Sequence, residues 1–232
     1  MSTPGGAATH VLVAVKDLTV AKSRLSGVLS DSARTGLVLS MLRDTLSVVR
    51  SVDSVSGITV VTPDDVVARV AREAGADVYP DPSPGIAASR TAEPEHGLNS
   101  ALGAAAEHVR HVDPAANLLA LQADLPALQV HELVAAFAAA RSYPRSMIVD
   151  HHGTGTAALF SCDPNTPLAP SFGPDSARRH LDSGAYPLDG NWPGLRTDVD
   201  TESDITVATA LGVGPATGQV LSALATPGPR LE

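Results

Sequence analysis

Short apolar runs alternate with amphipathic stretches through the first two thirds of the chain. Apolar runs of this length are typical of parallel strands that are buried on both faces. We expect strands at residues 11–15, 57–62, 77–79, 117–122 and 146–149. Apolar residues at helical spacing predict the helices between them, and the clearest begins at Ser30 or Asp31 and continues to about Val49. Further helices are expected at residues 66–74, 98–109 and 130–140.

This alternation predicts one α/β domain with a mostly parallel sheet that is covered by helices on both faces. A chain of 232 residues fits a single core. After about residue 150 the pattern is less regular, which predicts an irregular lid over the edge of the sheet. There we expect a strand at 157–160, extended pieces near Tyr186 and Leu195, and helices at 175–181, 202–211 and 215–224. The domain is expected to span residues 10–214, with flexible termini at 1–9 and 226–232 and a mobile loop at 80–95.

Composition narrows the possible functions. A formal net charge of −9 argues against an extended nucleic-acid surface, although a few cations suffice to bind a nucleotide. Cys162 is the only cysteine, which excludes an internal disulfide and a cysteine-based zinc site. No apolar run approaches the roughly 18–20 residues of a membrane span, and residues 1–9 lack the features of a signal peptide. We therefore expect a cytoplasmic protein with neither a nucleic acid nor a membrane as partner.

A basic loop follows the first predicted strand. It carries Lys16, Lys22 and Arg24 within residues 13–25. Ligands of open parallel sheets bind beyond the carboxyl ends of the strands, and three cations there suit a polyphosphate. The loop lacks the glycines of a Walker loop or a dinucleotide fingerprint. A solvated basic loop is the alternative, and the residues alone leave the two about equally favoured.

Three aspartates are candidate metal ligands. Asp124 is the only charged residue at the end of the apolar run 117–122. Mg²⁺ is usually bound by one or two carboxylates together with substrate phosphates. Asp198 and Asp200 alternate, so on an extended segment they point the same way and repel each other unless a cation or solvent separates them. A turn-capping role for Asp124 is the alternative. Thr201 or Ser203 is expected to cap the helix that follows.

The segments between these acids offer candidate substrate contacts. Residues 153–156 combine two glycines with two hydroxyls, including that of Thr156. Gly173 and Ser176 precede a predicted helix, whose first N–H groups bind anions readily. Taken alone, however, these segments favour an ordinary turn and a capped helix. Asn99 stands at another helix start and can contact a base or cap the helix. His151 and His152 are adjacent, so their side chains are expected to point apart, and no third metal ligand stands nearby in sequence.

Together these segments resemble the guanylyltransferases of deazaflavin coenzyme (coenzyme F-420) biosynthesis. The resemblance spans about residues 11–213 and is strongest to the actinobacterial branch, the phosphoenolpyruvate guanylyltransferases; archaeal relatives are 2-phospho-L-lactate guanylyltransferases. The segments that carry it, in the family's order, are residues 13–25, 60–64, 97–102, 122–128, 153–156, 172–176 and 192–201.

The resemblance implies a Rossmann-like nucleotidyltransferase fold, GTP as donor, Mg²⁺ as cofactor and diphosphate as leaving group. By similarity, Asp124 and one or both of Asp198 and Asp200 bind the metal, and the basic loop binds phosphates. The remaining implied contacts are Asn99 with the nucleotide, and Thr156, Gly173 and Ser176 with phosphoenolpyruvate. The implied product is enolpyruvoyl-2-diphospho-5'-guanosine, which the downstream deazaflavin transferase would use. The alternatives are 2-phospho-L-lactate as acceptor, or a nucleotide-binding protein without catalysis.

Overall fold

The computed structural model describes residues 8–18, 22–80 and 94–225. The predicted flexible residues 1–7 and 226–232, and most of the predicted loop at 80–95, lie outside this part. Within it, seven strands form one sheet in the order β3-β2-β1-β4-β6-β5-β7. The strands are β1 (Thr9–Ala14), β2 (Val55–Thr62), β3 (Asp77–Pro80), β4 (Asn117–Leu121), β5 (Arg145–Val149), β6 (Thr156–Ser161) and β7 (Tyr186–Pro187). Only β6 runs antiparallel to its neighbours among these strands, which confirms the mostly parallel sheet.

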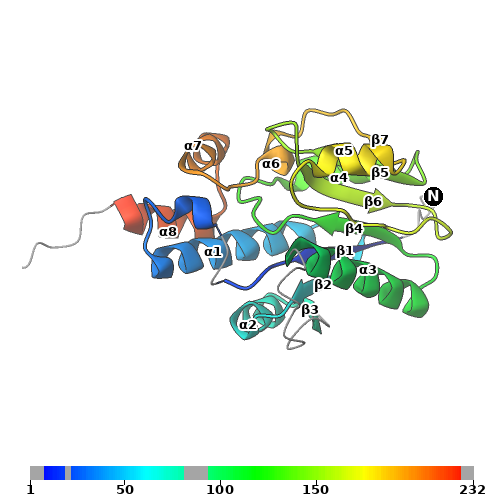
Figure 1. The fold of residues 1–232 in the computed structure, drawn as a ribbon, viewed down its shortest axis with the longest axis horizontal. Coiled ribbons are helices and arrows are strands. Elements are labelled where there is room, and N and C mark those ends of the chain that lie inside the picture. Colours follow the sequence, from blue (N-terminus) through cyan, green and yellow to red (C-terminus); the bar gives the residue numbers. More distant parts are fainter. Residues whose placement is uncertain (1–7, 19–21, 81–93, 226–232) are drawn as a thin grey trace, which may run out of the picture.

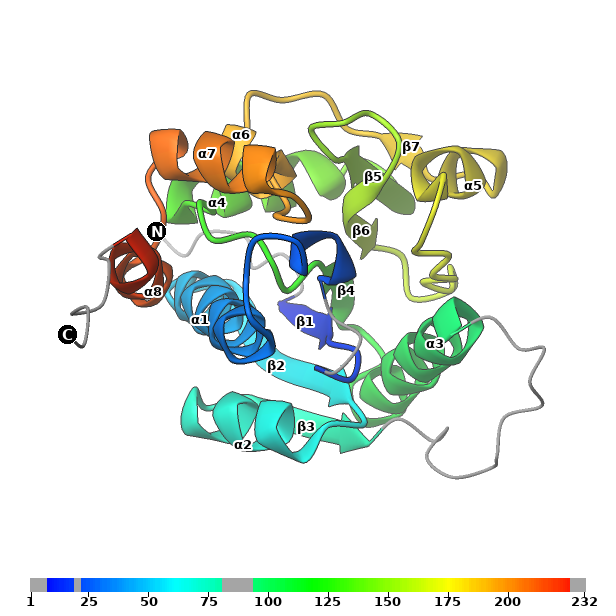
Figure 2. The same ribbon diagram turned by 60° about the vertical axis from the view of Figure 1, so that its left-hand side comes forward.

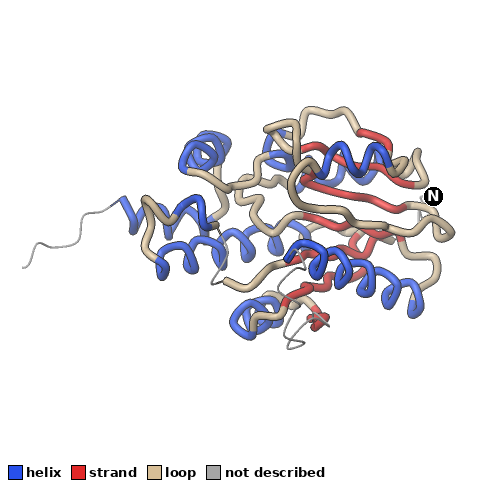
Figure 3. The backbone as a smooth tube through the Cα atoms, in the orientation of Figure 1, coloured by secondary structure: helices blue, strands red, loops and turns tan. Residues whose placement is uncertain are grey.

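Helices cover both faces of the sheet (Figures 1 and 2), and Figure 3 shows the strands in the layer between them. On one face lie α1 (Asp31–Arg50), α2 (Asp65–Glu73) and α4 (Val130–Ala140); on the other lie α3 (Pro94–Val112) and α5 (Ser176–Asp182). Val11 and Val13 pack with the first group, and Leu12 packs with the second. Both faces of β1 are therefore buried, which is why its sequence is continuously apolar rather than alternating.

The helix boundaries follow local capping. Ser30 accepts a hydrogen bond from the backbone N–H of Ala33 at the start of α1, so of the two predicted caps Ser30 is the one used. Asp64 caps α2 in the same way, and Gly75, with a φ of 77°, follows its end. No described helix combines the length and apolar character needed to cross a membrane.

After β7 the described chain forms helices, which lie toward the left-hand end of the sheet in Figure 1. They are α6 (Pro193–Arg196), α7 (Glu202–Leu211) and α8 (Pro215–Ala225), and the basic loop adds the short helix η1 (Ser23–Leu25). Leu195, expected in an extended piece, lies in α6 instead, where Pro193 occupies the first helical turn. Beyond the predicted boundary at residue 214, α8 packs on α1.

Asp44 joins these two helices. Its buried carboxylate accepts hydrogen bonds from the backbone N–H groups of Ala216 (3.0 Å) and Thr217 (2.7 Å), in the first turn of α8. A residue in α1 thus caps the start of α8, which fixes the C-terminal helix against the core.

Candidate active site

The candidate residues gather at one edge of the sheet. The parallel strands β1, β4 and β5 all end there, and the antiparallel β6 begins there. Residues that follow β1, β4 and β5 and those that open β6 are therefore brought together, as expected for an open α/β sheet. The backbone N–H of Val199 donates to the carbonyl of Asp124 (3.2 Å), which adds the segment after α6 to this edge.

Lys22 connects the basic loop to the predicted metal ligands. Its ammonium group pairs with the Oδ2 atom of Asp124 and, at 2.6 Å, with the Oδ1 atom of Asp200. Burial by itself lowers the pKa of Lys22, but the two carboxylates outweigh burial, so the net shift is upward. Lys22 is thus a buried, fully charged cation among carboxylates. Arg24 lies 3.7 Å from Asp200 with a side chain that is 73% exposed, and Lys16 is half-buried just after β1.

Asp198 and Asp200 flank Val199, which is buried in the core. The two aspartates therefore face away from the core, as the alternation predicted. Burial, together with the charges of Asp124 and Asp200, raises the pKa of Asp198 to about 7. Burial also acts to raise the pKa of Asp200, but the ammonium of Lys22 outweighs it and the net shift is downward.

The cluster contains three carboxylates and only one buried ammonium among its described members. The buried Oδ1 atoms of Asp124 and Asp198 lack a hydrogen-bond partner. Buried polar atoms are normally satisfied, and unpartnered carboxylate oxygens from separate chain segments suit a hard divalent cation. The donor set therefore fits the predicted Mg²⁺ site.

The predicted acceptor contacts lie around the start of β6. Gln122, two residues before Asp124, donates from its amide to the carbonyl of Thr156 (3.3 Å). The backbone N–H of Ala177, in α5, donates to the carbonyl of Thr154 (3.0 Å). Ser176, in the first turn of α5, is buried, and Gly173 has a φ of 121°, which only glycine adopts without strain. Thr156, Gly173 and Ser176 therefore share one region beside the aspartates.

His180 supports this region and was missed from the sequence. Its Nδ1 atom lies 2.8 Å from the hydroxyl of Thr156, and its Nε2 atom accepts from the backbone N–H of Ser171 (2.9 Å). The proton is therefore on Nδ1, which donates to Thr156. Burial, followed by the charges of Arg145 and Arg179, lowers the pKa of His180 to about 4. No sequence motif marks this histidine, because its partner lies 24 residues away.

Asn99 is placed beside the same turn. Its amide nitrogen donates to the carbonyl of Phe172 (2.9 Å), and its amide oxygen accepts from the Phe172 N–H (2.8 Å). The side chain thus joins α3 to the backbone just before Gly173. Its predicted contact with a nucleotide stays a prediction.

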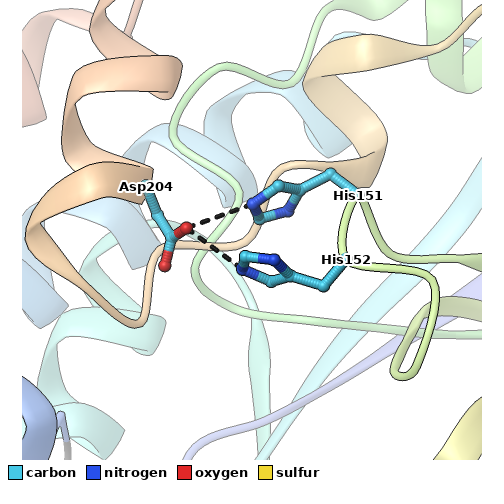
Figure 4. A group of neighbouring side chains, drawn as sticks. All are labelled: His151, His152 and Asp204. Carbon is cyan, nitrogen blue, oxygen red and sulfur yellow. Dashed lines mark hydrogen bonds and ion pairs between the residues drawn. The ribbon is translucent and has the colours of Figure 1, made fainter.

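The expectation that His151 and His152 point apart is wrong. Both rings face the carboxylate of Asp204, at 3.1 Å each (Figure 4). The two residues occupy a turn after β5 rather than an extended strand, so side-chain alternation does not apply. His151 also lies 3.4 Å from the Oδ1 atom of Asp198.

A separate cavity of about 470 Å³ lies at the amino end of β5, opposite the edge that carries the aspartates. It is lined by residues such as Tyr143, Arg145 and Tyr186, and by none of the predicted site residues. The guanidinium of Arg145 donates hydrogen bonds to the carbonyls of Leu168, Ala169 and Ser183, so it has a structural role there.

The fold, with its carboxylate cluster at the strand ends, is an α/β fold of the Rossmann-like type. Three solved structures share the fold. One from Desulfovibrio desulfuricans G20, named as a nucleotide-diphospho-sugar transferase, aligns with a TM-score of 0.63 at 13% identity and covers 94% of this chain and 96% of its own. A 4-diphosphocytidyl-2C-methyl-D-erythritol synthase gives 0.55 at 13% identity (88% and 98%). A cytidylyltransferase from Leptospira borgpetersenii gives 0.51 at 11% identity (94% of each chain).

Sequence comparison then identifies the family. Residues 9–183 match the family described as guanylyl transferase CofC like. The chain is 65% identical over 218 residues to the phosphoenolpyruvate guanylyltransferase of Rhodococcus opacus (93% of this chain, 90% of the relative). It is 50% identical over 219 residues to that of Mycolicibacterium smegmatis (94% and 92%). The chain belongs to the guanylyl transferase CofC-like family.

Proposed function

We propose that this chain transfers the guanylyl group of GTP to the phosphate of phosphoenolpyruvate. The products are enolpyruvoyl-2-diphospho-5'-guanosine and diphosphate, and the reaction belongs to deazaflavin coenzyme F-420 biosynthesis. The names of the relatives at 65% and 50% identity support the donor and the acceptor. The cluster of Asp124, Asp198 and Asp200 around Lys22 is the observation that carries the proposal, because it supplies what transfer between two polyanions requires.

Mg²⁺ is the proposed cofactor, held by the three aspartates. When bound, it would neutralise phosphate charge and polarise the reacting phosphoryl oxygens. The unpartnered Oδ1 atoms of Asp124 and Asp198 support these two residues as ligands. Asp200, which already shares Lys22 with Asp124, completes the proposed set.

Cations of the basic loop are proposed to bind the triphosphate. Lys22 is held at the centre of the cluster, and the exposed Arg24 and half-buried Lys16 can reach phosphates from its rim. In the reaction, a phosphate oxygen of the acceptor attacks the α-phosphorus of GTP, and diphosphate leaves from the opposite side. The attacking oxygen is already anionic, so no general base is needed. Lys16, Lys22 and Arg24 then stabilise the charge that develops on the leaving diphosphate.

The acceptor is proposed to bind at Thr156, Gly173 and Ser176, whose proximity to the aspartates supports the assignment. Asn99 is proposed to contact the nucleotide, and its bonds to Phe172 suit it equally to hold the Gly173 turn. The proposed partners are therefore small molecules, with functional coupling to the deazaflavin transferase that consumes the product. No nucleic acid, membrane or second protein is required for the chemistry.

Diphosphate release tests the proposal. The full chain is incubated with GTP and Mg²⁺, together with either phosphoenolpyruvate or 2-phospho-L-lactate. The deazaflavin acceptor and its transferase are present to trap the product. We expect release with phosphoenolpyruvate. Release with phospholactate alone would keep the mechanism and overturn the acceptor, since ligands this similar are separated by only about 1–3 kcal/mol of pocket contacts. If folded protein that still binds GTP releases diphosphate with neither acceptor, the proposal that the chain catalyses guanylyl transfer is wrong.

A further inference from the structure

Two histidines and one buried aspartate form a compact group next to the candidate active site. His151 and His152 follow β5, and Asp204 lies in the first turn of α7 (Figure 4). The Nε2 atoms of both histidines lie 3.1 Å from the Oδ1 atom of Asp204. The two rings are side by side, with centroids 3.8 Å apart. Three ligand atoms of the kinds that bind metals therefore lie within 4.8 Å of one another.

The Asp204 carboxylate is held in place by its other oxygen. Oδ2 accepts hydrogen bonds from the backbone N–H groups of Asp200 (3.0 Å) and Thr201 (2.7 Å) and from the Thr201 hydroxyl (2.8 Å). Burial acts to raise the pKa of Asp204, but these hydrogen bonds outweigh it and the net shift is downward. The carboxylate is thus ionised and oriented, and its Oδ1 atom is presented to the two imidazoles. Ligating carboxylates in metal sites are commonly fixed in this way.

His151 has oxygen atoms against both of its ring nitrogens. Nε2 faces Asp204, while Nδ1 lies 3.3 Å from the carbonyl of Arg196 and 3.4 Å from the Oδ1 atom of Asp198. A neutral imidazole carries one N–H, so either tautomer leaves one bare nitrogen facing an oxygen lone pair. A cation between Nε2 and Asp204 removes this conflict, because Nδ1 then carries the proton and donates to the carbonyl of Arg196. Metal-bound histidines normally donate their second N–H to a carboxylate or a carbonyl.

We propose that His151, His152 and Asp204 bind a divalent transition-metal ion such as Zn²⁺, at a site separate from the aspartate cluster. Imidazole nitrogens favour such ions over Mg²⁺, which prefers oxygen ligands. Ligand bonds of roughly 2.0–2.2 Å and the observed separation of 3.1 Å between Nε2 and Oδ1 give a ligand–metal–ligand angle of about 90–100°, within the range of common coordination geometries. The side chain of His152 is 52% exposed, which leaves the outer side of the site open to water.

An ion here would link the two halves of the candidate active site. His151 and His152 lie in the turn before Thr156, which Asp150 closes by accepting a hydrogen bond from the backbone N–H of Gly155. Asp204 follows the segment that carries Asp198 and Asp200. Within the described residues, His151 is the side chain that contacts both Asp198 and Asp204. Metal binding would therefore fix the acceptor turn against the segment that carries two of the three aspartates.

Zinc retention tests the proposal on the full chain. Wild-type protein, His152→Gln and His131→Gln are dialysed against micromolar Zn²⁺ in millimolar Mg²⁺, and retained zinc is counted by mass spectrometry. His131 is an exposed histidine on α4 and serves as the matched control. We expect one equivalent in the wild type and the control. His152→Gln should weaken zinc binding by at least about 10–100-fold, the loss that even a residue supporting a ligand causes. Glutamine at this half-exposed position should leave the fold intact, which circular dichroism verifies.

Visible absorption of bound Co²⁺ is an independent test of whether the same residues bind a metal ion. Co²⁺ bound by imidazoles absorbs in the visible region, and this band should vanish in both His151→Gln and His152→Gln and persist in His131→Gln. Three results would overturn the site: no zinc retained by the wild type, equal retention by His152→Gln and His131→Gln, or a Co²⁺ band that survives both site variants. The first would mean that these residues hold no ion, and the others would place the ion elsewhere, such as at the aspartates.

Discussion

Asparagine in place of Asp198 keeps the shape of the side chain and removes its charge. The variant therefore shows how the charge of Asp198 affects the stability of the fold and, in a separate assay, how it affects turnover. Asp198 is buried beside Asp124 and Asp200, its Oδ1 atom lacks a hydrogen-bond partner, and its raised pKa reflects the same burial and repulsion. A buried polar atom without a partner costs about 1–3 kcal/mol, more when it is charged. We therefore expect Asp198→Asn to stabilise the metal-free protein.

The expected gain of about 1–3 kcal/mol corresponds to a rise in Tm of roughly 2–12 °C for a chain of this size. Differential scanning calorimetry in buffer with a chelator measures it, with Asp189→Asn, an exposed aspartate, as the control. Added Mg²⁺ should raise the Tm of the wild type and have little effect on Asp198→Asn, because the variant lacks one ligand. Turnover should fall by orders of magnitude, the usual conflict between stability and function at such sites.

The opposite shift in Tm would refute this reasoning. A variant that melts several degrees below the wild type without metal would mean that Asp198 stabilises the fold, through His151, rather than opposing it. Near-normal turnover of the folded variant would remove Asp198 from the proposed metal site.

Three further predictions follow from single contacts. Asp124→Asn should leave the circular dichroism spectrum unchanged and lower kcat by about 10²–10³ or more, the loss seen when one group that stabilises transition-state charge is removed; a folded variant with near-normal kcat would exclude its role. The pKa of His180, about 4 when folded against 6.5 when unfolded, means that the unfolded chain binds the extra proton. The free energy of unfolding of the wild type should therefore fall by up to about 3 kcal/mol as the pH falls from 6.5 to 4. Urea unfolding should show a smaller fall in His180→Asn. Parallel pH curves for the two proteins would contradict the assignment. Asp44→Ala removes two hydrogen bonds to a carboxylate and should lower the free energy of unfolding by about 2–4 kcal/mol, as measured with urea. Asp44→Asn should have an intermediate effect. A loss below about 1 kcal/mol would show that α8 does not depend on this cap.

The sheet could be predicted because burial on both faces leaves a clear mark on the sequence. Val11, Leu12 and Val13 all had to be apolar, since successive side chains enter different cores. The direction of Asp198 and Asp200 could be predicted for a related reason, because an apolar Val199 between them has to face inward. Periodicity therefore located one pair of candidate ligands as well as the strands.

Other features depend on contacts that periodicity does not encode. His151 and Asp204 are 53 residues apart, and a turn rather than a strand sets the direction of the histidines. His180 reaches Thr156 across two elements, and nothing in the sequence around either residue marks the pair. Leu195 lies in a single helical turn too short for a periodic pattern, which Pro193 opens. Long-range partners and one-turn elements were thus the parts that required the structure.

The fate of the α-phosphate tests the central claim most directly. GTP labelled at the α-phosphorus, and in parallel GTP labelled at the γ-phosphorus, is incubated with the full chain, Mg²⁺ and phosphoenolpyruvate, with the deazaflavin acceptor and its transferase present. Guanylyl transfer predicts that the α-label passes through the phosphoenolpyruvate adduct into GMP released by the transferase, while the γ-label appears only in diphosphate. Appearance of the γ-label in a phosphoenolpyruvate product, or α-label in GDP with free phosphate, would show a different reaction and contradict the account.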